Sequence, residues 1–156
     1  MGAWSPSIMG GDTPLDIESM FEDRFGSSDP ERAEDGLPEY RVPTSAELID
    51  FIGKTTADYG DGEIVAQVTG FLALQRGAEM SEELRALVLA GIDQEAAEGA
   101  VEWDRPEERL AALAEFRALV AIYQGGAVEL PHQEGLFERI FAAEAQGLLG
   151  KASAGK

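Results

Sequence analysis

Hydrophobic residues recur along most of the chain at intervals of three and four, which is the spacing of one face of an α-helix. The first such stripe follows Asp12-Thr13-Pro14, where a capping side chain and an early proline favour a helix start. Its apolar positions are Leu15, Met20, Phe21 and Phe25, and Gly26 ends it. Prolines, glycines and charges fill the next segment, 26–43, which predicts a long loop or flexible connection.

Five further stripes predict helices after that connection. Thr44-Ser45-Ala46-Glu47 has the spacing of a capping box, and we expect the short helix that it opens to end near Gly53. The remaining stripes cover residues 62–76, a helix that begins at Ser81, a helix that begins at 104–106 and reaches Tyr123, and a last helix over 131–149. No stretch shows sustained alternation, and a short strand near the N-terminus or at 127–130 is the alternative for those segments.

These patterns predict an all-α fold, a compact bundle of five or six helices with a long loop after the first helix. The chain has 156 residues, the usual size of one domain. We expect a single acidic helical domain over 1–150 and a flexible tail over 151–156. The sequence does not define an oligomeric state.

Charge is the unusual property of this composition. Thirty Asp and Glu face twelve Lys and Arg, a net charge of −18. Nucleic acid and anionic lipid repel such a chain, whereas basic surfaces attract it. We therefore expect a basic protein surface as the partner, with no direct nucleic-acid contact and no membrane contact.

Cellular location follows from three absences in the sequence. The chain contains no cysteine, which fits a reducing compartment. Its start shows no basic region followed by an apolar one, and no apolar run reaches the roughly 18–20 residues needed to cross a bilayer. We expect a cytoplasmic protein, in the host bacterial cytoplasm if phage-encoded.

Motifs for catalysis or metal binding are weak. Gly53-Lys54-Thr55-Thr56 resembles the end of a phosphate-binding loop, but Leu48 stands where that loop needs glycine. The acids at 58, 61 and 63 do not have the spacing of a calcium loop. His132 is the one histidine, and neither Glu134 nor Glu138 shares its helical face. We expect no catalytic residues, no metal and no cofactor, hence a binding protein and not an enzyme.

The acids gather in two main groups, at 93–108 and at 12–39. On a helix, acids three or four residues apart repel one another, a cost that a basic partner surface would offset. The candidate partner-binding residues are Asp93, Glu95, Glu98, Glu102, Asp104, Glu107, Glu108, Asp16, Glu22 and Asp23.

Such a surface fits an acidic protein-binding inhibitor that imitates nucleic acid. A phage-type inhibitor of this kind would occupy the DNA- or RNA-binding surface of a bacterial enzyme such as a topoisomerase or gyrase, a restriction enzyme or a CRISPR effector. The alternatives are an immunity-type protein that neutralises a basic toxin, or a non-enzymatic scaffold domain. Adaptation to high salt would also produce an acidic composition.

The opening Met1-Gly2-Ala3-Trp4, with the helix start at Pro14-Leu15-Asp16, resembles an uncharacterised bacterial domain family whose members open with Met-Gly-Ala-Trp-Gly. The run Met80-Ser81-Glu82-Glu83-Leu84-Arg85 is similar to the middle helix of that family. Ser5-Pro6 stands where the family has glycine, and Gly10-Gly11-Asp12 replaces an Asn-Asp-Asp-like run. The resemblance implies a compact helical domain, in which we expect Trp4 to pack on the helices, and it implies no activity.

Overall fold

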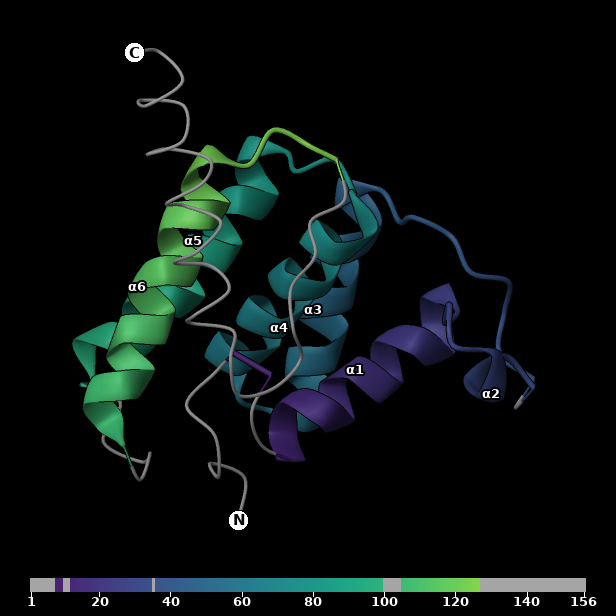
Figure 1. The fold of residues 1–156 in the computed structure, drawn as a ribbon, viewed down its shortest axis with the longest axis horizontal. Helices are drawn as coiled ribbons and strands as arrows, with labels where there is room; N and C mark the ends of the chain where they lie inside the picture. Colours follow the sequence, from purple (N-terminus) through teal and green to yellow (C-terminus); the bar gives the residue numbers. More distant parts are fainter. Residues whose placement is uncertain (1–7, 10–11, 35, 100–104, 127–156) are drawn as a thin grey trace, which may run out of the picture.

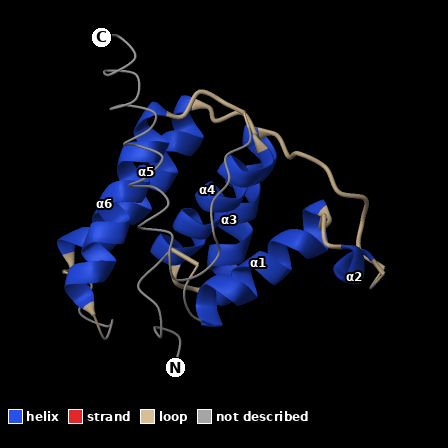
Figure 2. Cartoon of the chain, in the orientation of Figure 1, coloured by secondary structure: helices blue, strands red, loops and turns tan. Residues whose placement is uncertain are grey.

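The fold is all-α, as the periodicity predicts. The computed structural model describes residues 8–9, 12–34, 36–99 and 105–126, and these contain helices and no strand (Figure 2). The helices are α1 (Asp12–Phe25), α2 (Pro30–Ala33), α3 (Ser45–Tyr59), α4 (Gly62–Arg76), α5 (Glu82–Ala97) and α6 (Pro106–Ile122). Within this part of the chain, no helix is long and apolar enough to cross a membrane.

Helices α3 to α6 run alternately up and down, and α4 lies at the centre (Figure 1). Contacts between side chains define this order. Ser45 at the start of α3 bonds the backbone at Glu79, just beyond the end of α4. Gln67 on α4 bonds Glu95 on α5, which in turn bonds Arg109 on α6. The end of α3 and the starts of α4 and α6 therefore lie at one end of the bundle, together with the end of α5. The start of α1 lies there too, because Asp16 accepts a hydrogen bond from the Tyr59 hydroxyl at the end of α3.

Side-chain caps fix the starts of α3 and α5. Thr44 and Glu47 form the reciprocal capping box that the sequence predicts at α3. Ser81 accepts a hydrogen bond from the Leu84 N–H and caps α5. In contrast, α6 begins after Arg105 with no side-chain cap bond, although Pro106 favours a start there.

Two glycines allow α4 and α5 to pack closely. A Cβ atom on Gly70 would lie 2.6 Å from a methyl carbon of Val88, and one on Gly91 would lie 2.9 Å from the Glu63 carbonyl oxygen. Any larger residue would push the two helices apart. The buried face of α4 accordingly extends around most of the helix between Val65 and Leu74.

Three phenylalanines join α1 to α3. The ring of Phe21 meets those of Phe25 and Phe51 edge-on, with centroids 4.8 and 5.4 Å away. All three side chains are buried. These rings belong to the same hydrophobic core as the buried residues of α4, α5 and α6.

Three sequence expectations need correction. Helix α3 continues past Gly53 to Tyr59, because Gly53 faces solvent and costs the helix only about 1 kcal/mol, while Thr55 beyond it is buried. In α1 the inward position is Ile17, and Leu15 is exposed. The connection 26–43 contains the short helix α2.

Other expectations fall outside the described residues. These are the helix over 131–149, the tail over 151–156, the alternative strands, His132 and the packing of Trp4.

Candidate functional site

The starts of α1, α4 and α6 and the ends of α3 and α5 lie at one end of the bundle, at the bottom of Figure 1. Exposed acids from four helices lie on or next to these segments. We call this region the acidic end. It consists of Asp12 and Asp16 on α1, Asp58 and Asp61 around the turn from α3 to α4, Glu98 after α5, and Glu107 and Glu108 on α6. The arrangement of the helices places these residues at the same end of the bundle although they lie up to 96 positions apart in the sequence, from 12 to 108.

The exposed base of the described acidic end is Arg105. Its guanidinium lies 3.0 Å from the Glu108 carboxylate. The other base near this end, Arg109, is fully buried. The end therefore presents a strongly negative surface.

Two of these carboxylates lie where the helix itself disfavours negative charge. Asp58 lies in the last turn of α3, and Glu98 follows the last residue of α5. Neither last turn contains a basic residue. Because the C-terminus of a helix carries partial negative charge, an acid there costs about 0.3–1 kcal/mol at low ionic strength. Helix stability does not account for these two acids.

The predicted acids on α1 have different surroundings. Asp16 is exposed and accepts a 3.0 Å hydrogen bond from the Tyr59 hydroxyl on α3. Burial is the main cause that raises the pKa of Tyr59, and the nearby charges of Asp16 and Asp61 also raise it. Glu22 is half-buried and accepts a bond from the Ser27 hydroxyl, whereas Asp23 is exposed on the last turns of α1, away from the acidic end.

Among the predicted acids of 93–108, Glu98, Glu107 and Glu108 lie at the acidic end. Asp93 is exposed but forms an ion pair with Arg117 on α6, with a 2.7 Å contact that lowers the pKa of the carboxyl. Glu102 and Asp104 lie outside the described residues.

The prediction that Glu95 belongs to the partner surface is wrong. Its side chain is buried and both carboxylate oxygens bond Arg109, at 2.7 and 2.8 Å. Gln67 completes the group, since it donates to Glu95 at 2.9 Å and accepts from Arg109 at 2.7 Å. We call Gln67, Glu95 and Arg109 the buried polar cluster. An unpaired charge in this position would be very costly, which explains why each ion meets its partner there.

Sequence reasoning also missed part of the acidic end. From the sequence, Asp58 and Asp61 are only weak candidates for metal ligands. Among the described residues no group of three possible metal ligands forms. The segment Gly53-Lys54-Thr55-Thr56 lies inside α3, where Lys54 pairs with Asp50 at 3.2 Å, so it forms no phosphate-binding loop.

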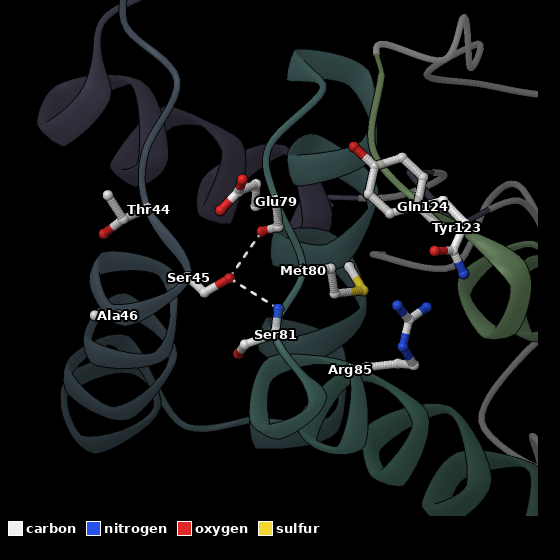
Figure 3. Close-up of a pocket in the computed structure, with 9 residues that line it drawn as sticks. All are labelled: Thr44, Ser45, Ala46, Glu79, Met80, Ser81, Arg85, Tyr123 and Gln124. Carbon is white, nitrogen blue, oxygen red and sulfur yellow. Dashed lines mark hydrogen bonds between the residues drawn. The ribbon is translucent and has the colours of Figure 1, made fainter.

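A pocket of about 500 Å³ lies at the opposite end of the bundle, between the start of α3, the turn from α4 to α5 and the residues after α6 (Figure 3). Its polar groups join these elements. The Ser45 hydroxyl donates to the Glu79 carbonyl and accepts from the Ser81 N–H, at 2.8 and 2.9 Å. Arg85 donates to the Val120 carbonyl at 2.5 Å. These hydrogen bonds connect neighbouring helices, so the polar groups of the pocket hold the helices together.

Charge is more balanced at this opposite end. Glu47 is paired with Arg41, and Arg85 lies 3.7 Å from Glu82. Two arginines thus pair with acids there, whereas at the described acidic end one exposed arginine, Arg105, does so.

Comparison with known proteins adds no assignment. No protein-family model matches the chain, and no curated protein or solved structure matches it significantly.

Proposed function

We propose that this protein is an acidic inhibitor that binds a basic protein surface through its acidic end and imitates nucleic acid there. The partner is a bacterial nucleic-acid-binding enzyme, whose Arg and Lys side chains would meet carboxylates in place of phosphates. Such pairing mainly raises the association rate and makes binding sensitive to salt.

One observation carries this proposal: acids occupy the acidic end even where the fold disfavours them. Acids in the first turns of α1 and α6, such as Asp12 and Glu107, also stabilise their own helices. Asp58 and Glu98 do the opposite at helix C-termini. Residues that weaken the fold yet extend a charged surface are expected where the surface binds a partner of opposite charge.

The test compares two double variants that each change the net charge by two. Asp58→Asn/Glu98→Gln removes the disfavoured acids of the acidic end. Glu82→Gln/Glu83→Gln removes two exposed acids from the first turn of α5 at the opposite end. We expect the first variant to be slightly more stable than the parent and the second slightly less stable, since the helix dipole acts with opposite sign.

Binding should follow the opposite order. The parent and both variants are immobilised, exposed to a bacterial lysate and eluted with a salt gradient. We expect a nucleic-acid enzyme to be retained by the parent and by Glu82→Gln/Glu83→Gln, to elute earlier from Asp58→Asn/Glu98→Gln, and to be displaced by duplex DNA. Equal retention on all three proteins, or no displacement by DNA, would contradict the proposal.

A further inference from the structure

The buried polar cluster lies directly beneath the acidic end and joins three helices. Gln67 comes from α4, Glu95 from the last turn of α5 and Arg109 from the first turn of α6. Arg109 and Gln67 are fully buried, and Glu95 is 5% exposed. The residues on either side of the cluster in sequence include acids of the acidic end, Glu98 on one helix and Glu107 with Glu108 on the other.

Among the described residues, the start of α6 has no side-chain cap bond. The apolar inward residues of α6, Leu113 and Phe116, favour burial of the helix. Hydrophobic contacts are not directional, so they do not set the exact position of the helix along its neighbours. The paired bonds from Arg109 to Glu95 are different, because a guanidinium and a carboxylate meet in one planar arrangement.

The end of α6 is held separately. Arg85 donates to the Val120 carbonyl, and the Tyr123 hydroxyl donates to the Ala78 carbonyl at 2.7 Å. Loss of the buried polar cluster would therefore release the start of α6 while its end stays attached.

We propose that Gln67, Glu95 and Arg109 are positioning residues, which hold the start of α6 at one place against α4 and α5 and so fix the spacing between Glu98 and the pair Glu107 and Glu108. This role rests on the proposed function, since the spacing matters to a partner that reads the carboxylates as an array. Buried ion pairs contribute little net stability compared with well-packed apolar residues, and conformational specificity is the property that they supply in some proteins.

The experiment measures distances between pairs of spin labels in the full chain, which contains no cysteine of its own. One pair, at Ala97→Cys and Glu107→Cys, reports the start of α6 against the end of α5. A second pair, at Ala86→Cys and Ala121→Cys, reports the opposite end. All four positions are exposed.

The decisive variant replaces the cluster with apolar residues, Gln67→Leu/Glu95→Leu/Arg109→Met. We expect it to fold, with roughly a twofold broader distance distribution for the first label pair and an unchanged distribution for the second. An unchanged first distribution in the folded variant would overturn the proposal. Gln67→Met is the milder second variant, which removes one amide and keeps the ion pair, and it should broaden the first distribution less.

The matched control is the exposed ion pair between the same two helices, Asp93→Asn/Arg117→Gln. It should leave both distributions as narrow as in the parent. Equal broadening in this control would show that any ion pair between α5 and α6 fixes the helix, which would also overturn the proposal.

A binding measurement then separates this proposal from the proposed function. The apolar variant keeps every carboxylate of the acidic end, so a partner captured by the parent should elute from it at lower salt. If the parent captures no partner, the proposed function fails while the label distances still decide the positioning role.

Discussion

Two arginines of this protein, Arg109 fully buried and Arg76 half-buried, are held in two different ways. Arg109, between α4, α5 and α6, meets a full negative charge on Glu95. Arg76, at the end of α4, meets backbone carbonyls: it donates to Phe25 at 2.9 Å, to Arg41 at 2.7 Å, and to Gly26. Burial lowers the pKa of the Arg76 guanidinium, whose carbon also lies 4.4 Å above the Tyr40 ring.

The difference shows two ways to satisfy a cation. Phe25 and Gly26 end α1, so their carbonyls carry the partial negative charge of a helix C-terminus. Arg76 remains half-exposed, and partial charges with aromatic faces are enough to hold it. Arg109 is removed from water completely, and only an ionised partner can offset that desolvation.

The largest expected effect comes from Glu95→Ala, which leaves Arg109 charged and unpaired. We expect the free energy of unfolding to fall by about 3–5 kcal/mol in urea titrations. Glu98→Ala, three residues further along, serves as the control and should not lower the free energy of unfolding, because an acid at a helix C-terminus costs about 0.3–1 kcal/mol. A loss below about 1 kcal/mol for Glu95→Ala would mean that water reaches the cluster.

Gly26→Ala should have the next largest effect, because Arg76 depends on the path of the chain at Gly26. Gly26 has φ +82°, and its Cβ would lie 2.6 Å from the Pro38 carbonyl oxygen and the Tyr40 backbone. We expect the free energy of unfolding to fall by about 2–3 kcal/mol, because the alanine would strain the backbone at residue 26 and displace the segment at Pro38 and Tyr40. Gly36→Ala, also at positive φ but with open space around it, should lose less stability. Thermal unfolding of both variants checks this order.

Arg76→Met should cost about 2 kcal/mol, less than the loss at Glu95, because the carbonyls that it releases lie closer to water. Arg76→Lys should recover only part of the stability lost in Arg76→Met, since an ammonium cannot stack on Tyr40 while it reaches several carbonyls. Urea unfolding of both variants tests this order. Equal losses for Arg76→Met and Glu95→Ala would erase the distinction between the two arginines.

The smallest effect concerns the exposed pair of Arg41 and Glu47. Hydrogen bonds from Arg41 lower the pKa of Glu47 to about 2 from an ordinary 4.5. Because the folded pKa is the lower one, the pair contributes to stability above pH 4.5 and the contribution disappears as the pH falls towards 2. An NMR titration should show the midpoint of Glu47 rising in Arg41→Gln, and an unchanged midpoint would contradict the assignment.

How far the sequence predicts this molecule depends on whether a signal is local. Caps and helix starts are local, so Thr44, Ser81 and Pro106 predict three starts correctly. Gly53 predicts a helix end that does not occur, because burial of the residues on either side outweighs the preference of one glycine.

The acidic end depends on packing between helices, which no local pattern contains. The sequence does hold a signal for the buried cluster: Glu95 falls three residues after Ile92 and seven after Val88, on the same inward face. Arg109 likewise precedes Leu113 by four residues. A charge on an apolar stripe indicates a buried ion, but its partner becomes known only once the helices are placed.

The cap that Arg76 provides for α1 has a consequence for the order of folding. Arg76 and Phe25, whose carbonyl it bonds, lie 51 residues apart in the sequence. In the buried polar cluster, the bonds between α5 and α6 join Glu95 and Arg109, which lie 14 residues apart. Contacts at short separation close with less loss of chain entropy and form earlier. We expect α4, α5 and α6 to assemble first, and the last turn of α1 to become protected from amide exchange only after the end of α4 exists to receive it.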